Sequence, residues 1–253
     1  RGSSVANAQN MSKVVDIVIK AVDRDRTILV ASAISGCTDT LIRIGTLASE
    51  RDESYKTLID ELQQKHHDII NELLPREKQV ESLEVCDSLF DSLRSITQGV
   101  YLLGELSPAS LDAIQSFGEL WSTKILATKI ASIGIATKWI DSRSIIRTIA
   151  KGDKNVVDVQ KTYYRINEVV ENDPVTQLFV LPGFIASDKQ GRTTTLGRGG
   201  SDYTASLYAV GCKARILEIW TDVPGMMTSN PTVVPTARTI SNISYKAALE
   251  LSH

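Results

Sequence analysis

The segment Gly191 to Ala205 (GRTTTLGRGGSDYTA) combines hydroxyl and guanidinium side chains with closely set glycines, directly before a predicted helix. Glycines let the backbone approach a ligand and turn its N–H groups inward. Ser201 and Asp202 can cap the helix, whose positive end faces the same place. The segment therefore predicts an anion-binding loop built on Gly197, Gly199 and Gly200. It matches neither a Walker A loop nor a GxGxxG fingerprint, and the alternative is a surface loop followed by a well-capped helix.

The elements around this loop alternate between helix and strand. Apolar residues at helical spacing predict helices, and short β-branched runs predict strands. The predicted helices cover about 14–22, 55–74, 80–103, 110–132, 156–170 and 201–210. The predicted strands cover 26–32, 135–141, 177–182 and 214–223, and a loop covers 183–200. This order favours one domain with a mostly parallel sheet that has helices on both faces.

Composition excludes several classes of function. Lys and Arg number 28 against 30 Asp and Glu, so no basic surplus is present to neutralise a nucleic acid. The apolar runs are far shorter than the ~20 residues of a spanning helix, and residues 1–10 show no signal-peptide pattern. We therefore expect a cytoplasmic protein that binds neither nucleic acid nor membrane.

Cysteine and histidine give no metal-site pattern. Cys37, Cys86 and Cys212 are widely spaced and are predicted to be buried thiols. His66 and His67 are adjacent on a predicted helix, so they point to different sides and cannot share an ion. We expect both histidines on a solvated helix face.

The loop also carries a family resemblance. LGRGGSDYTA resembles the hallmark of aspartate kinases in the amino acid kinase family. Further motifs follow the family's order, and the match covers essentially the whole chain: Val5–Asn7, Ser32–Asp39, Ser116–Glu119, Pro182–Phe184, Trp220–Val223 and Ser244–His253. The resemblance implies an α/β fold, a three-layer α/β/α sandwich with a mainly parallel central sheet. The helices at about 55–103 would form the helical insertion of such kinases.

The implied reaction is transfer of the ATP γ-phosphate to the side-chain carboxylate of L-aspartate, giving 4-phospho-L-aspartate for lysine, threonine and methionine biosynthesis. A carboxylate with a pKa near ~4 is already ionised, so no general base is required. The protein must position two anions and neutralise charge on the phosphoryl group. Mg²⁺ would accompany ATP, held by phosphate oxygens and water rather than by a protein metal site.

The resemblance assigns a role to individual residues. Arg198 would bind a substrate carboxylate through two parallel hydrogen bonds, and Glu119 would bind the α-ammonium group. Asp202 would orient catalytic lysines. The remaining substrate residues would be Ser32, Thr38, Phe184 and Ser201, and the nucleotide residues Gly2, Ser3, Thr221 and Asp222. Each assignment has a structural alternative. Arg198 could be an exposed loop residue, Glu119 a solvated helix residue, Asp202 a helix cap and Asp222 a turn residue. The hydroxyl groups of Ser32, Thr38 and Ser201 could simply cap helices or close turns.

Some family features are missing from the sequence. The family's KFGG and FGAK lysines are not in it, and Met227 and Thr232 stand where Tyr and Arg are expected. We therefore expect a catalytic domain trimmed at both ends, inactive as it stands and without its regulatory ACT domains, from a homo-oligomeric parent. The rivals are a kinase for glutamate, acetylglutamate or a nucleotide, and a non-catalytic effector-binding or assembly module with a kinase fold.

Overall fold

The computed structural model describes residues 2–152, 154–221, 223, 225–230 and 232–251 in two compact units, Arg1–Ile219 and Trp220–His253. The helices of the first unit are α1 (Ala8–Val22), α2 (Cys37–Ser49), α3 (Ser54–Leu73), α4 (Arg76–Leu103), α5 (Pro108–Ser132), α6 (Val159–Glu171) and α7 (Gly200–Gly211), with the short 3-10 helices η1 (Gly2–Val5) and η2 (Ser142–Ser144). Its strands are β1 (Thr27–Ala31), β2 (Thr137–Trp139), β3 (Thr148–Lys151), β4 (Lys154–Val157), β5 (Leu178–Pro182), β6 (Ile185–Ser187) and β7 (Thr193–Thr195).

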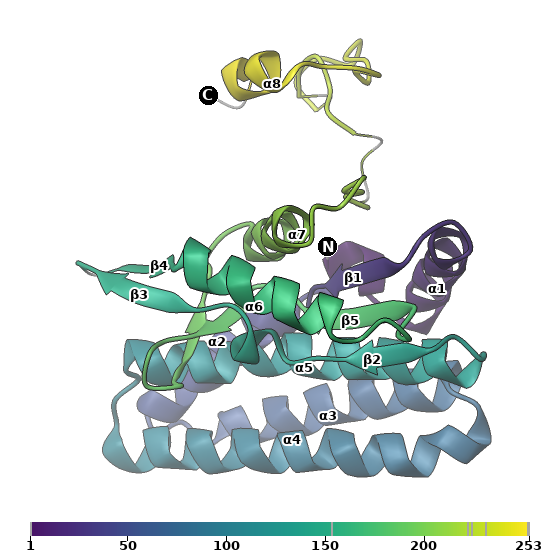
Figure 1. Cartoon of the computed structure of the whole chain (residues 1–253). Helices are drawn as coiled ribbons and strands as arrows, with labels where there is room; N and C mark the ends of the chain where they lie inside the picture. Colours follow the sequence, from purple (N-terminus) through teal and green to yellow (C-terminus); the bar gives the residue numbers. More distant parts are fainter. Residues whose placement is uncertain (1, 153, 222, 224, 231, 252–253) are drawn as a thin grey trace. The chain divides into compact units, whose positions relative to one another are not determined.

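A parallel sheet of order β1-β5-β2 lies between two helical layers (Figure 1). Strand β5 is buried on both faces, and its side chains alternate between two apolar cores. Leu178 and Val180 join the core of α1 to α5, whereas Phe179 and Leu181 join the core of α6 and α7. The predicted three-layer α/β/α fold with a parallel sheet is confirmed.

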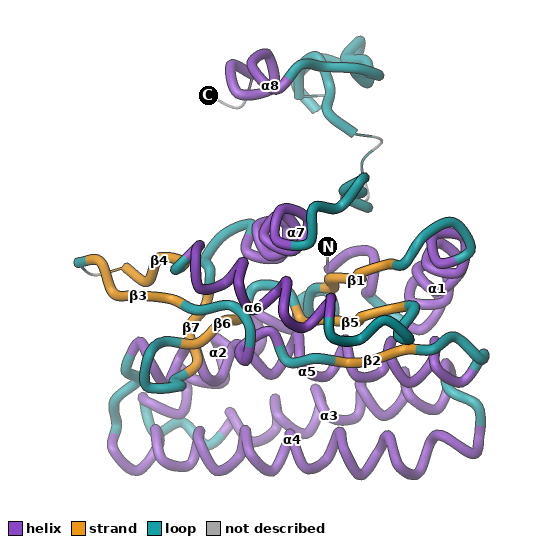
Figure 2. Tube along the Cα trace, viewed as in Figure 1, coloured by secondary structure: helices purple, strands orange, loops and turns teal. Residues whose placement is uncertain are grey.

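Two antiparallel ribbons, β3–β4 and β6–β7, extend beyond the sheet (Figure 2). Neither ribbon was predicted, because residues 183–200 were expected to form a loop and a helix was expected to start at residue 156. Each strand of these ribbons has only three or four residues. Such runs are too short to show a period-2 pattern.

The predicted helical hairpin is confirmed as α3 and α4, and its core is aromatic. The rings of Phe90 and Trp121 stack with centroids 4.0 Å apart, and the His66 ring lies 4.8 Å from that of Trp121. The expectation that His66 faces solvent was wrong, because its side chain is fully buried and its Nδ1 lies 2.7 Å from the Leu62 carbonyl oxygen. Burial lowers the pKa of His66 to about 4.

The expected strand at 214–223 is also absent from the described residues of that range. A strand requires a paired neighbour, whereas this segment is held by a hydrogen bond from Ala214 N to the Ala209 carbonyl at 2.8 Å and by side-chain contacts. Arg215 pairs with Asp25, and Glu218 lies 3.6 Å from Arg24. Apolar residues had suggested a buried strand, yet Ile216 is 53% exposed.

The second unit contains α8 (Tyr245–Leu251) and one antiparallel bridge between Met227 and Thr239. Backbone hydrogen bonds flank the bridge, from Thr228 N to Arg238 O at 2.9 Å and from Ile240 N to Met226 O at 2.8 Å.

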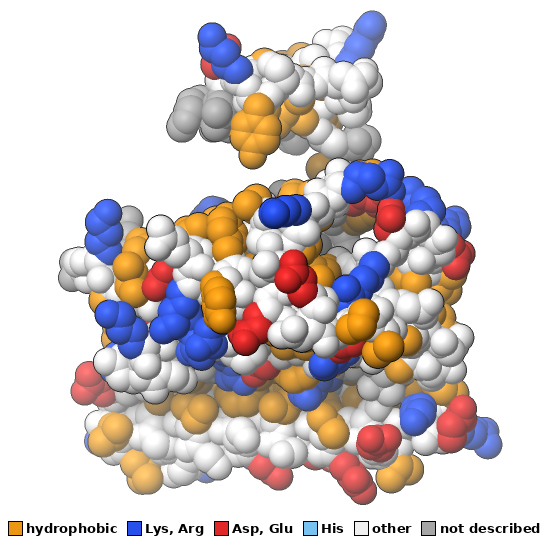
Figure 3. Space-filling model, in the orientation of Figure 1, with side chains coloured by type: hydrophobic (Ala, Val, Ile, Leu, Met, Phe, Trp, Pro, Cys, Tyr) orange, Lys and Arg blue, Asp and Glu red, His pale blue; other side chains and the backbone are white. Residues whose placement is uncertain are grey.

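The surface carries charges of both signs. In the view of Figure 3, Lys and Arg side chains gather near β3 and the start of α6, with acidic side chains interspersed. Among the described residues, no helix combines the length and the apolar character that crossing a membrane requires. Cys37 and Cys86 are buried as predicted, and Cys212 is partly buried.

Candidate active site

The carboxyl end of β1, the start of α2, the middle of α5 and the loop before α7 together line a pocket of about 500 Å³. Most of the residues singled out from the sequence lie around it: Gly2, Ser32, Thr38, Glu119, Phe184, Gly197, Arg198, Gly199, Gly200, Ser201 and Asp202. Ser3 follows Gly2 in η1, and its carbonyl oxygen accepts a hydrogen bond from Asn10 Nδ2 at 2.9 Å. Thr221 belongs to the second unit, and Asp222 lies outside the described residues.

The parallel register of the sheet explains why segments so far apart in the sequence meet here. Ala31 pairs with Pro182, and Gly183 N donates to the Ala31 carbonyl at 2.9 Å. Ser32 and Phe184 therefore leave adjacent strands at the same edge. Ligands of open α/β sheets bind at such carboxyl ends.

The glycine loop enters α7 through two left-handed residues. Gly197 and Gly199 have φ of 71° and 72°, values that L side chains rarely adopt. Gly199 is itself the N-cap, with no capping side chain, so the expectation that Ser201 and Asp202 cap the helix was wrong. Both lie inside the first turn of α7 and line the pocket, and the first backbone N–H groups of a helix have no partner within it.

Close contacts between backbone and side chains fix the pocket walls. A Cβ on Gly183 would lie 2.6 Å from Ser201 Oγ, and one on Gly200 would lie 2.7 Å from the Phe184 ring. Phe184 itself has a φ of 68°, and its N–H donates to Thr204 Oγ1 at 3.0 Å. Thr204 was not among the predicted site residues, although its place one turn after Gly200 was an available signal.

Gly118 makes the same kind of contact on the α5 side of the pocket. A Cβ there would lie 2.7 Å from the Ala33 Cβ, so only glycine lets α5 approach the chain after β1 this closely. The next residue, Glu119, is thereby placed against Ala33. The expectation that Glu119 might be a solvated helix residue does not hold, because its side chain is 3% exposed.

Glu119 is the most strongly perturbed acid of the pocket. Its Oε1 accepts a hydrogen bond from Ala33 N at 3.1 Å, while its Oε2 has no hydrogen-bond partner among the described residues. Burial raises the pKa of Glu119 to about 8, so without a neighbouring cation it is protonated at neutral pH. A cation beside Oε2 would favour the carboxylate, which is the property required of a site for an ammonium group.

Two further side chains support the pocket from outside and were not foreseen. Thr195 Oγ1, at the end of β7, donates to Asp112 Oδ1 of α5 at 2.8 Å, which ties the glycine loop to the helix that carries Glu119. Lys65 Nζ of α3 donates to the Ser35 carbonyl at 3.2 Å. The helical hairpin therefore contacts a residue that lines the pocket. No cluster of acidic, Cys and His side chains able to hold a metal occurs in the described part of the chain.

The model of the amino acid kinase family matches residues 2–253. The lysine-sensitive aspartokinase 3 of Escherichia coli (strain K12) is 33% identical over 266 residues, spanning 99% of this chain and 54% of that protein. The chloroplastic bifunctional aspartokinase/homoserine dehydrogenase 1 of Zea mays is 30% identical and spans 100% of this chain and 27% of that protein. The chain thus spans between about a quarter and a half of the relatives it matches.

Solved structures agree with these sequence matches. E. coli aspartokinase III in complex with aspartate and ADP superposes with a TM-score of 0.87 at 30% identity, covering 99% of this chain and 54% of that one. The Clostridium acetobutylicum aspartate kinase gives a TM-score of 0.75 at 27% identity, covering 100% and 53%.

Proposed function

Because the chain belongs to the amino acid kinase family, we propose that it is the catalytic part of an aspartate kinase. It would transfer the γ-phosphoryl group of ATP to the side-chain carboxylate of L-aspartate and release ADP and 4-phospho-L-aspartate. The observation that carries the proposal is the pocket itself. One buried acid with an unpartnered oxygen and one arginine, Glu119 and Arg198, line it beside a glycine loop that starts a helix.

Each end of an α-amino diacid has a counterpart in this pocket. Glu119 would accept the α-ammonium group at Oε2, and ionisation of Glu119 would accompany binding. Arg198 would hold a carboxylate through two parallel hydrogen bonds, with Ser32, Thr38 and Ser201 as hydroxyl partners. E. coli aspartokinase III, whose structure includes aspartate and ADP, has the same fold.

The reaction needs positioning more than proton transfer. One aspartate side-chain oxygen forms a bond to Pγ while the bond from Pγ to the β,γ-bridging oxygen breaks, and the electron pair leaves on ADP. No proton moves, because the attacking carboxylate is already ionised. The N–H groups at the start of α7, made accessible by Gly197, Gly199 and Gly200, would stabilise charge on the transferring group.

The nucleotide half of the site is also part of the proposal. Gly2 lines the pocket, and we assign Gly2 and Ser3 to ATP and Asp202 to the orientation of cationic groups. Thr221 and Asp222 stay predicted nucleotide residues. Mg²⁺ bound to ATP would neutralise phosphate charge, with its ligands supplied mainly by phosphate oxygens and water.

The test is an acyl-phosphate assay on the protein expressed from its complete gene. With ATP, Mg²⁺ and hydroxylamine as a trap, L-aspartate should give a hydroxamate, whereas L-glutamate and N-acetyl-L-glutamate should give no more than the substrate-free control. Product from either glutamate compound alone would identify another amino acid kinase. Absence of product from all three, with the protein folded, would support the non-catalytic alternative.

A further inference from the structure

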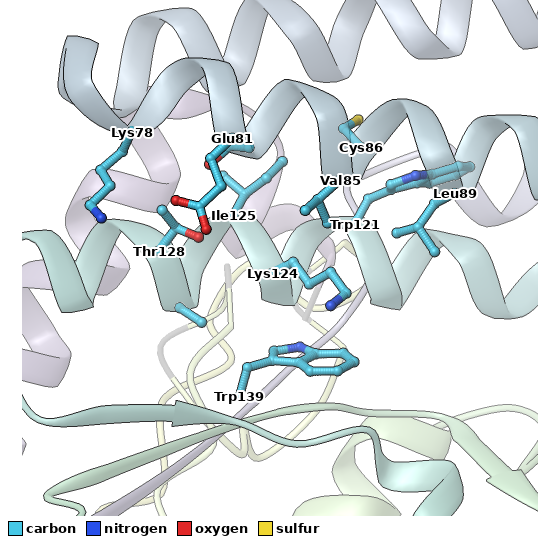
Figure 4. A pocket seen from close by; sticks show the side chains of 12 residues that line it. Lys78, Glu81, Val85, Cys86, Leu89, Trp121, Lys124, Ile125, Thr128 and Trp139 are labelled. Atoms are coloured by element: carbon cyan, nitrogen blue, oxygen red, sulfur yellow. The ribbon is translucent and has the colours of Figure 1, made fainter.

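A second pocket, of about 250 Å³, lies between α4, α5 and β2. It shares no lining residue with the substrate pocket. Figure 4 shows Lys78, Glu81 and Val85 reaching it from α4, Trp121 and Lys124 from α5, and Trp139 from β2.

The apolar part of this pocket contains an unsatisfied donor. Trp121 is 1% exposed, and its Nε1 has no hydrogen-bond partner among the described residues. Trp139 differs, because its Nε1 donates to Thr123 Oγ1 at 2.9 Å. Buried N–H groups in folded proteins are nearly always paired. The Trp121 ring packs against Phe90 and His66, so it contributes an apolar wall to the pocket.

The polar part of the pocket is dominated by Lys124. Its Nζ lies 3.7 Å from the centroid of the Trp139 ring, and the side chain is partly buried. Burial lowers the pKa of Lys124, the nearby charge of Asp141 opposes this shift, and that of Arg143 adds to it. Lys78 adds a second positive charge, whereas the carboxylate of Glu81 belongs to an exposed residue. An anionic group beside Lys124 would restore the favourable environment of a charged ammonium.

We propose that this pocket binds a small organic monocarboxylate with an apolar ring or branched chain. The carboxylate would pair with Lys124, whose Nζ lies over the Trp139 ring. The apolar body would pack against Val85, Leu89 and Ile125. A cavity of about 150 Å³ holds benzene, so about 250 Å³ leaves room for a ring with a short acidic chain.

Isothermal titration with 3-phenylpropionate tests the proposal, and 3-phenylpropan-1-ol is the matched ligand without the charge. The expected Kd of the acid is about 0.1–1 mM, with the alcohol at least about tenfold weaker. Lys124→Gln should weaken acid binding about tenfold. Lys129→Gln, on the same helix but outside the pocket, should change it less than about twofold.

A second variant separates loss of the site from loss of folding. Val85→Phe extends a 40% exposed side chain into the pocket without removing a core group, and it should abolish binding while the melting temperature is kept. Failure of 3-phenylpropionate to bind at 10 mM would overturn the proposal. So would equal affinities for acid and alcohol, or unchanged binding in folded Lys124→Gln and Val85→Phe proteins.

Discussion

Glu119 and Arg198 reach one pocket from different elements, α5 and the glycine loop. The two side chains differ in burial. Glu119 is buried with one oxygen unpartnered, whereas Arg198 lies in the exposed part of the loop between two left-handed glycines. The first residue is therefore held in place before substrate arrives, and the second depends on the loop backbone for its position.

Arg198→Ala should raise the KM for aspartate or lower kcat/KM by a factor equivalent to roughly 2–5 kcal/mol, because a substrate charge would lose its partner. Hydroxamate kinetics of the complete protein measure this. Arg192→Ala is the matched control, since Arg192 pairs with Asp188 at 2.7 Å and does not line the pocket. Aspartate kinetics that are unchanged in Arg198→Ala would refute the assignment.

The burial of Glu119 has a consequence for stability. Its pKa is about 8 in the folded protein and 4.5 in the unfolded chain, so the folded state holds the extra proton between these values. Glu119 makes its full contribution to the free energy of unfolding below about pH 4.5, and this contribution is lost as the pH rises to about 8. Glu119→Gln removes the titration, so its stability relative to wild type should increase from pH 5 to pH 8.

Melting temperatures of both proteins at pH 5, 6, 7 and 8 check this sign. Each pKa unit corresponds to about 1.4 kcal/mol at most, and other titrating groups cancel in the comparison. Parallel curves would show that Glu119 is ionised in the empty pocket.

At the scale of elements, the pocket depends on backbone segments that approach more closely than a Cβ allows. Gly183→Ala would place a Cβ 2.9 Å from the Ser201 Cα, a backbone atom of α7. The helix must then move, which we expect to destabilise the protein by about 1–3 kcal/mol and to weaken aspartate binding.

Gly99→Ala is the matched control for this prediction. Gly99 lies inside α4, and a Cβ there would meet nothing within 4 Å, so alanine should stabilise the protein by about 0.5–1 kcal/mol. Urea unfolding of both variants measures the two effects. Equal effects of the two substitutions would mean that Gly183 is not a close-packing position.

Elements with a long apolar stripe could be predicted from the sequence, and those that depend on a partner could not. The helices α3, α4 and α5 start and end within a few residues of their predicted limits, except for the start of α4. The segment 214–223 had a strand-like composition but no neighbouring strand, and sequence alone does not reveal whether a ladder forms. His66 looked like a solvated residue because its neighbour His67 and much of that helix are polar.

The same distinction holds for the candidate site. The glycine loop could be found because closely set glycines directly before a helix let backbone N–H groups approach an anion. The burial of Glu119 and the unpaired Trp121 indole depend on how α5 packs against β1 and α4, which no local pattern contains. Other supporting residues do not line the pocket but hydrogen-bond to residues near it, so their residue types did not identify them: Thr204, Asp112 and Lys65.

At the scale of the whole molecule, the described residues form two units, and the substrate pocket lies within the first, Arg1–Ile219. Both layers of that unit contribute to the pocket, α5 from one side of the sheet and α7 from the other. Substitutions in either apolar core should therefore affect substrate binding as well as stability.

The pairing of Thr27 with Leu178 sets the order in which this molecule can fold. The two partners are about 150 residues apart, so the central strand pair closes a very long loop, whereas α3 and α4 meet across a turn of two residues. Pulse-labelling hydrogen exchange during refolding should show amides of α3 and α4 protected before those of β1 and β5. Simultaneous protection would show that the sheet and the helical hairpin form in one cooperative step. The carboxyl edge of the sheet, which carries the substrate pocket, would then form at the same time as the helices.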